Sequence, residues 1–204
     1  MRKRLTAWLF SMLMVHVAGR RPPNFIVGAD DPAGAYLRRW YITPWRGWFQ
    51  AIPEPQRNRW QRSVVWTTQH LLPNLYLHQF LRDDDDRALH DHPSWAVSLI
   101  LRGAYLEHTR GHDGRPVRHL HEAGSLRFMP TLHAHRIELL REVVVPIDRH
   151  SAGQPPAVHP KPCWTLFLFG PKRRDWGFWC GDRWVPWQQF TAAGKPGEVG
   201  RGCD

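Results

Sequence analysis

The sequence predicts an all-β fold, an antiparallel barrel or sandwich preceded by a helical N-terminal extension. The 204 residues include 18 prolines and 16 glycines and only 23% charged residues. This composition is more typical of short strands joined by turns than of long helices. Short runs of alternating apolar and polar residues also recur between turn signals from residue 75 to residue 190. The length suits one domain with additions.

The first 20 residues predict an amphipathic helix. A basic start is followed by residues that recur at helical spacing, namely Leu5, Trp8, Leu9, Met12, Leu13 and His16. The segment is short for a membrane span, and its small-residue cleavage pattern is poor for a secretory signal. The helix is therefore expected either to dock on the domain or to lie on a membrane surface, and the sequence leaves both open.

Residues 21–74 predict an extension rich in Trp, Arg and Pro. A strand is expected at residues 36–42, and a short helix between residues 56 and 72 that Pro73 ends. The barrel itself is expected to span residues 75–190. Residues 191–204 are expected to form a flexible tail.

Short strands are expected in succession within the barrel, separated by Gly-containing turns. Their ranges are 75–82, 94–101, 104–110, 117–121, 125–129 and 135–141. Residues 150–162 predict a Pro-rich surface loop. The apolar run 164–169 is typical of a strand buried on both faces, and residues 176–180 and 184–187 predict a final hairpin.

The net charge of +10 comes from 28 Lys and Arg against 18 Asp and Glu. A basic surface favours nucleic acid, anionic lipid or carboxylate substrates as partners. No compact basic run is interleaved with aromatic residues, which disfavours nucleic acid. A small-molecule ligand is the expected partner. A homodimer through sheet edges, covered by the Trp-rich extension, is a further expectation.

Three cysteines, Cys163, Cys180 and Cys203, form an odd set without a CxxC pair. The set predicts neither a disulfide framework nor a structural zinc site. It favours a reducing compartment, so a cytoplasmic location is expected.

Three histidines have the spacing of metal ligands. His90 and His92 are one residue apart, so both are expected on one face of a strand. His135 follows on a later strand. Imidazole is the commonest metal ligand in proteins, and three imidazoles from neighbouring strands can hold a divalent ion with open coordination positions.

The residues around these histidines resemble the two motifs of the cupin superfamily. The first cupin motif is an HxH pair followed by three or four residues, a Glu, six residues and a Gly. His90 and His92, with Gly103, match it. The second motif is a Gly, five residues, a Pro and a His five positions later. It is matched at positions 124, 130 and 135. The same stretch resembles small cupin-type proteins of phage and bacterial genomes.

The cupin resemblance implies an antiparallel β-barrel of the jelly-roll type with a metal held by His90, His92 and His135. Ala96 stands where cupins have their Glu ligand. Some cupin oxygenases, such as the cysteine dioxygenase type, also lack this Glu and use three histidines with ferrous iron. Fe²⁺ is therefore the expected metal, with Zn²⁺, Mn²⁺ and Ni²⁺ as alternatives. Either Glu107 or Glu138 fills the missing place, or the site is degenerate.

The resemblance implies a mononuclear metal-binding cupin, and the leading hypothesis is a non-haem iron dioxygenase for a small polar or carboxylate substrate. The alternatives are a non-catalytic ligand-binding or accessory module and a metal-dependent isomerase or hydrolase. Arg127 and Arg136 are candidates to pair a substrate carboxylate, and Tyr105 is a candidate to line the barrel mouth.

Other polar residues near the motifs are expected to have structural roles. His133 is interpreted as a rim residue. Asp91 is expected to point outward from the loop between the two histidines. The acidic run at residues 83–86 is expected to form a solvated turn paired with nearby arginines.

Overall fold

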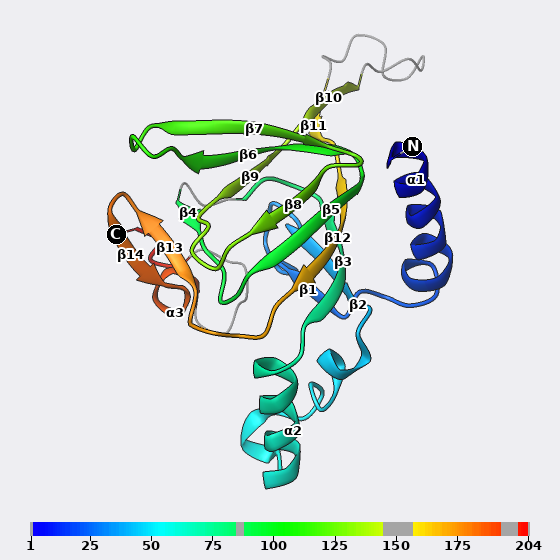
Figure 1. The fold of residues 1–204 in the computed structure, drawn as a ribbon, viewed down its shortest axis with the longest axis vertical. Coiled ribbons are helices and arrows are strands. Elements are labelled where there is room, and N and C mark those ends of the chain that lie inside the picture. The colour runs from blue at the N-terminus through cyan, green and yellow to red at the C-terminus, as the bar shows by residue number, and fades with distance from the viewer. Residues whose placement is uncertain (1, 85–87, 145–156, 193–199, 204) are drawn as a thin grey trace.

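The computed structural model describes residues 2–84, 88–144, 157–192 and 200–203 (Figure 1). The N-terminal part contains the helices α1 (Arg2–Leu13), η1 (Met14–Ala18), η2 (Pro44–Gly47), η3 (Glu54–Gln56) and α2 (Arg59–His70), with the strands β1 (Phe25–Val27) and β2 (Leu37–Tyr41) between them. The strands that follow are β3 (Asn74–Phe80), β4 (Leu89–His90), β5 (Ala96–Arg102), β6 (Ala104–Arg110), β7 (Pro116–Glu122), β8 (Leu126–Met129), β9 (Arg136–Leu139), β10 (Arg141–Val144), β11 (Ala157–Pro160), β12 (Cys163–Phe169), β13 (Gly177–Cys180) and β14 (Arg183–Pro186). The short helix α3 (Trp187–Phe190) comes last.

One layer of the molecule is a six-stranded antiparallel sheet in the order β1-β2-β3-β12-β5-β8. The central strand β12 pairs with β3 along its whole length and with β5 on its other edge. Its run of apolar residues follows from this central position, because both faces of the strand are covered. The strand that the sequence predicts at residues 164–169 is therefore confirmed.

The second layer consists of two three-stranded sheets, β7-β6-β9 and β14-β13-β4. An isolated antiparallel bridge joins them at His90 and His135, where each backbone N–H donates to the other residue's carbonyl at 2.9 Å. Core residues from both layers pack between them, including Leu37, Ile100 and Ile137. The expectation of an all-β antiparallel fold with an N-terminal helix is confirmed.

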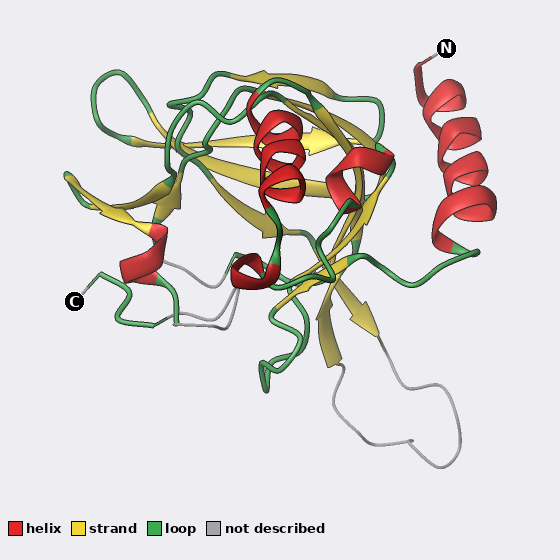
Figure 2. Ribbon diagram, turned by 90° about the horizontal axis from the view of Figure 1, so that it is seen from below, coloured by secondary structure: helices red, strands yellow, loops and turns green. Residues whose placement is uncertain are grey.

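Helix α1 packs on the outer face of the six-stranded sheet, at the side of the molecule away from α3 (Figure 2). Leu9, Phe10 and Leu13 of the helix contact a cluster that includes Trp40 and Trp164. Docking on the domain is thereby confirmed. The predicted apolar face was partly wrong, because both sides of the helix are apolar and the side with Leu5, Trp8 and Met12 is exposed. Contact with a membrane surface stays a prediction.

Two segments differ from their expected structure. Strands β1 and β2 lie in the expected extension, but β2 pairs with β3 and β1 pairs with β2, so the six-stranded sheet begins before residue 75. Residues 157–160 were expected in a loop but form β11, which pairs with β10. The rest of that expected loop, up to residue 156, lies outside the described residues. The domain boundaries stay predictions.

A disulfide joins Cys180 and Cys203, whose Cα atoms are 5.4 Å apart, so the expectation of unpaired cysteines was wrong. The physical reason is that the two cysteines are 23 residues apart in sequence and meet only because the chain folds back to the end of β13. Their spacing alone does not reveal this contact. Arg183 fixes this return by donating to the carbonyl of Cys203 at 2.8 Å. Cys163 is a free, buried thiol. The cytoplasmic location stays a prediction.

Within the described ranges, none of the helices combines the length and the apolar character needed to cross a membrane.

Candidate metal centre

The strand pairing brings the three predicted histidines together. His90 ends β4 and faces His135 across the bridge, so the two side chains project from the same face of the layer. His92 follows two residues later, after the chain has left the strand. The ring of His92 lies 5.3 Å from that of His90 and 5.1 Å from that of His135, centroid to centroid. The sequence prediction that these three residues share one place is therefore met by the structure.

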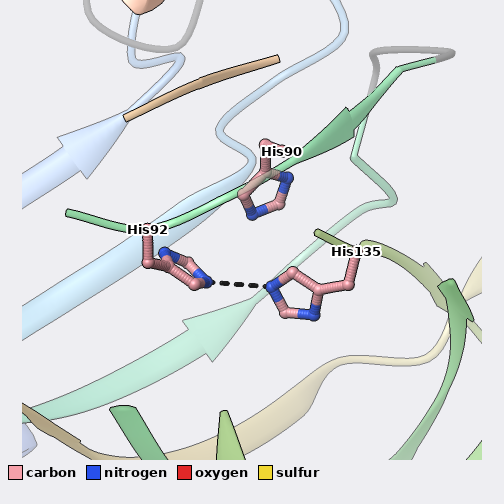
Figure 3. A group of neighbouring side chains, drawn as sticks. All are labelled: His90, His92 and His135. Atoms are coloured by element: carbon pink, nitrogen blue, oxygen red, sulfur yellow. Dashed lines mark hydrogen bonds between the residues drawn. The ribbon is translucent and has the colours of Figure 1, made fainter. Parts of the chain in front are cut away.

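The three imidazoles face one another across a small space (Figure 3). The Nε2 atoms of His92 and His135 are 2.9 Å apart. One ligand nitrogen from each of the three rings lies within 4.8 Å of the others, so the group could hold a metal ion. Two nitrogens that each lie about 2.1 Å from a common ion would be about 3.0–3.4 Å apart, close to the observed separation.

Carboxylates approach two of these rings from the side away from the shared space. Oε1 of Glu107 lies 2.8 Å from Nδ1 of His135. Oδ2 of Asp84 lies 3.6 Å from Nδ1 of His90. Metal-binding histidines usually offer their second ring nitrogen to such a partner, which fixes the tautomer and the orientation of the ring. The arrangement leaves the Nε2 atom of His135 free to act as a ligand.

Glu107 is the centre of a buried polar network. Its carboxylate is fully buried and forms an ion pair with Arg127. It also lies 3.0 Å from Nε2 of His133 and 3.3 Å from Nε2 of His121. Burial by itself would raise the pKa of Glu107, but the contacts with His133, His135 and Arg127 hold this pKa well below its usual value. Glu107 is therefore a carboxylate at neutral pH.

Glu107, His133 and His135 form a second group that could hold an ion. In this group the carboxylate already pairs with the Arg127 cation, so its charge is compensated without a metal. The same contacts bear on the expectation that Glu107 takes the place of the missing cupin Glu as a ligand of the three-histidine group, and they do not favour it. Glu107 approaches His135 at Nδ1, on the far side of the ring from His92. Glu138 instead pairs with His108 at 2.6 Å.

Burial keeps two of the candidate ligands, His90 and His92, neutral. It lowers the pKa of His90 to about 4, although the nearby Asp84 acts in the opposite direction. Burial also lowers the pKa of His92 well below its usual value, and the neighbouring His135 adds to this effect. Neutral imidazole is the form that binds a metal, so these two rings have the correct protonation state at neutral pH.

Asp91 was expected to point outward, and this was wrong: its side chain is fully buried. It accepts hydrogen bonds from the backbone of Gly177 at 2.9 Å and from Nε1 of Trp184 at 3.0 Å, and it pairs with Arg174 at 2.8 Å. Strand β4 ends at His90, so the alternation that predicted an outward side chain does not reach residue 91. Asp91 ties the loop between the two histidines to β13 and β14.

The acidic run at residues 83–86 is only partly a solvated turn. Asp83 pairs with Arg141, as expected of this run. Asp84 is buried, and it accepts from the backbone N–H of Ile137 at 2.7 Å while it faces His90. Residues 85 and 86 lie outside the described part of the chain. No pattern in the sequence indicated that Asp84 lies beside a candidate ligand, because this contact forms only when the chain folds.

The three substrate-binding candidates lie in different environments. Arg127 faces the interior but pairs with Glu107. Arg136 is half-buried on β9, next to His135 in sequence and therefore directed to the other face of the strand. Tyr105 is buried in the core near Phe80, and burial raises its pKa.

Several solved structures are similar to parts of the chain. One of them is the crystal structure of Fe(II)-HppE with the alternative substrate (S)-1-HPP. The match covers 72% of this chain, at 11% identity and a TM-score of 0.40. The EutQ protein of Clostridium difficile matches over 76% of the chain and 84% of its own length, at 8% identity and a TM-score of 0.40.

A third similar structure is an uncharacterised conserved protein with a double-stranded β-helix domain from Klebsiella pneumoniae. It matches over 52% of this chain and 73% of its own, at 12% identity and a TM-score of 0.33. This chain spans 55% of the HppE chain, or little more than half. No family model and no curated protein matches the chain. At these identities the likeness concerns the fold alone.

Proposed function

We propose that His90, His92 and His135 bind one divalent metal ion and that the protein is a metal-dependent cupin acting on a small molecule. The observation that carries the proposal is the convergence of three imidazoles from two separate segments of the chain. A carboxylate stands behind two of the three rings. Solvated or purely structural histidines do not need this combination.

The proton positions around His135 support this assignment. The Glu107 carboxylate can only accept a hydrogen bond, so Nδ1 of His135 bears the proton and its Nε2 has the lone pair. That lone pair points to His92, whose own Nε2 is 2.9 Å away. Without a metal, His92 donates its Nε2 proton to His135. To hold a metal, His92 would carry its proton on Nδ1, so that the Nε2 lone pairs of His92 and His135 could both serve as ligands.

Fe²⁺ is the metal that we propose, with oxygenase chemistry as the leading activity. A ferrous ion with three imidazole ligands supplies O₂ activation and has open positions for a substrate. The surrounding residues would control this chemistry. Glu107 orients His135, while the Phe167 and Phe169 rings, 6.1 and 6.0 Å from His92, exclude water from one side.

Metal analysis of protein purified without a histidine tag tests the proposal. The parent is compared with His90→Ala and His135→Ala, and with His119→Ala as a control at an exposed histidine of β7. We expect one equivalent of iron in the parent and the control and none in the two site variants. Zinc in the same place would direct the search to hydrolase or isomerase chemistry. The absence of any bound metal after reconstitution would leave a ligand-binding module.

A further inference from the structure

Three polar residues lie side by side across the middle of the six-stranded sheet. Arg39 of β2 is directly opposite His78 of β3, and His78 is directly opposite Thr165 of β12. Directly paired residues share a face of the sheet. This face is the interior one, because the His78 ring stacks on Phe167 at 5.0 Å and packs edge-on against Phe80.

Arg39 is an interior cation without a carboxylate partner. Its Nε donates to Nε2 of His78 at 2.9 Å, and its guanidinium lies over the rings of Phe25 and Tyr76. Burial lowers its pKa, and the ionisable groups that act on it are tyrosines and Arg46. Within the described residues its two Nη groups form no hydrogen bond. The Arg39 side chain is half-buried, and a charge that is partly withdrawn from water normally has a partner of opposite charge.

Three other arginines that are buried or half-buried have a carboxylate at ion-pair distance: Arg82 with Asp31, Arg127 with Glu107 and Arg174 with Asp91. Arg39 differs from these three, because its side-chain partner is a neutral imidazole. A position that keeps an unpaired interior cation is a candidate binding site for an anion from outside the chain.

The neighbours of Arg39 offer further hydrogen-bond donors. Because the Arg39 Nε–H donates to Nε2 of His78, the proton of this neutral ring is on Nδ1. That Nδ1–H and the hydroxyl of Thr165 are buried without a hydrogen-bond partner. Such groups are rare in folded proteins. A carboxylate offers acceptors to all three residues.

A second arginine adds to the positive potential. Arg46 of η2 donates from Nε to the Tyr76 hydroxyl at 3.1 Å, and its guanidinium lies over the Tyr41 ring. Both tyrosines also lie near Arg39. The interior end of β2 and β3 thus presents two guanidinium groups and no described acidic side chain among the groups that act on Arg39.

The cluster faces the same interior as the three histidines. The Phe167 ring contacts His78 on one side and lies 6.1 Å from His92 on the other, centroid to centroid. The Arg39 charge also contributes to the lowered pKa of His92. One small molecule could reach from the guanidinium, past the Phe167 ring, to the metal centre.

We propose that Arg39 binds the carboxylate of a small carboxylic acid whose other end reaches the three-histidine centre. The planar guanidinium fits the two oxygens of a carboxylate, and the Arg39 Nη groups are available for them. Arg127 cannot serve in this way without leaving Glu107. The part of this proposal that concerns the metal rests on the proposed function. The part that concerns the carboxylate rests only on Arg39 and its neighbours.

Calorimetric titration of the full-length protein, loaded with Fe²⁺ under anaerobic conditions, tests this assignment. Pyruvate and succinate are the probes, and acetamide is the neutral control. Arg39→Gln removes the cation, and Arg39→Lys keeps the charge without the planar fork. Arg38→Gln is the matched control, because Arg38 is the exposed neighbour on the opposite face of β2.

We expect at least one acid to bind the parent and Arg38→Gln with a dissociation constant at or below about 1 mM. Arg39→Gln is expected to weaken this binding at least tenfold, and Arg39→Lys to give an intermediate value. The Arg39 variants should keep their bound iron. Their melting temperatures should equal or exceed that of the parent, because no ion pair is lost.

Equal binding by the parent and Arg39→Gln, or no binding of either acid to the parent, would overturn the inference. So would a large loss of thermal stability in both Arg39 variants, which would assign the guanidinium a structural role. The metal analysis separates the two proposals. Iron at the histidines without Arg39-dependent binding leaves the proposed function standing. Arg39-dependent binding by a protein that takes up no metal leaves only the carboxylate site.

Discussion

Asp91 is predicted to hold the loop between His90 and His92 in place. Replacing it with Asn keeps the side-chain volume but removes the charge that pairs with Arg174. Breaking a fully buried pair costs about 3–5 kcal/mol of unfolding free energy. Because the Arg174 side chain is 28% exposed, water can solvate part of its charge, and a loss of about 2–3 kcal/mol is expected.

This loss would be large enough to measure by urea or thermal unfolding followed by circular dichroism. A change of 2–3 kcal/mol corresponds to a decrease in melting temperature of about 4–12 °C for a chain of this size. A double-mutant cycle isolates the pair. Arg174→Met combined with Asp91→Asn should recover part of the loss, since the unpaired cation is gone.

The loop adds a second readout for Asp91. His90 and His92 flank the residue, so loosening its bonds to Gly177 and Trp184 should also lower metal affinity. If the free energy of unfolding of Asp91→Asn were within about 0.5 kcal/mol of that of the parent, the reasoning would be refuted, because removing one member of a buried ion pair should cost more than this. This result would show that Asp91 is solvated in solution.

Three further predictions concern the buried groups. Glu107→Gln should lower metal affinity about 10–100-fold while His135 stays bound, because the amide is a weaker acceptor for its Nδ1–H; equilibrium dialysis against a chelator checks this, and an unchanged affinity would contradict it. In metal-free protein, His90 has a pKa of about 4 against 6.5 in the unfolded chain. The unfolded state therefore binds more protons in this window, and stability should fall by up to about 3 kcal/mol as the pH decreases from 6.5 to 4. Urea titrations across this window would show a flat profile if the ring were solvated. Burial raises the pKa of Cys163 to about 12, so this thiol should resist alkylation in the native protein and react only on unfolding, as mass spectrometry can show.

The sequence predicted most of the strands because their signals are local. Turns at positions such as Gly103 and alternation along β5 and β6 do not depend on the rest of the chain. The HxH pair and His135 were recognised from spacing for the same reason. The apolar residues of α1 were also recognised, but not the side that packs, since the helix is apolar on both sides.

The surroundings of the site could not be predicted because they depend on contacts between distant segments. Arg127 was a candidate to pair a substrate carboxylate, yet its partner is Glu107, which belongs to the other layer. Arg39 belongs to no sequence motif. It became a candidate only because none of the ionisable groups that act on it in the folded protein is an acidic side chain. The sequence does not show which side chains surround a residue, so it could not show that an acidic neighbour is missing.

The bridge between His90 and His135 gives the proposed ion a mechanical role as well as a chemical one. The two residues join the two halves of the second layer through a pair of backbone hydrogen bonds. An ion held by their side chains would cross-link that seam from the interior side. Amide hydrogen exchange at these two positions should then slow when the ion binds, so the state of the centre can be read from the backbone without any substrate.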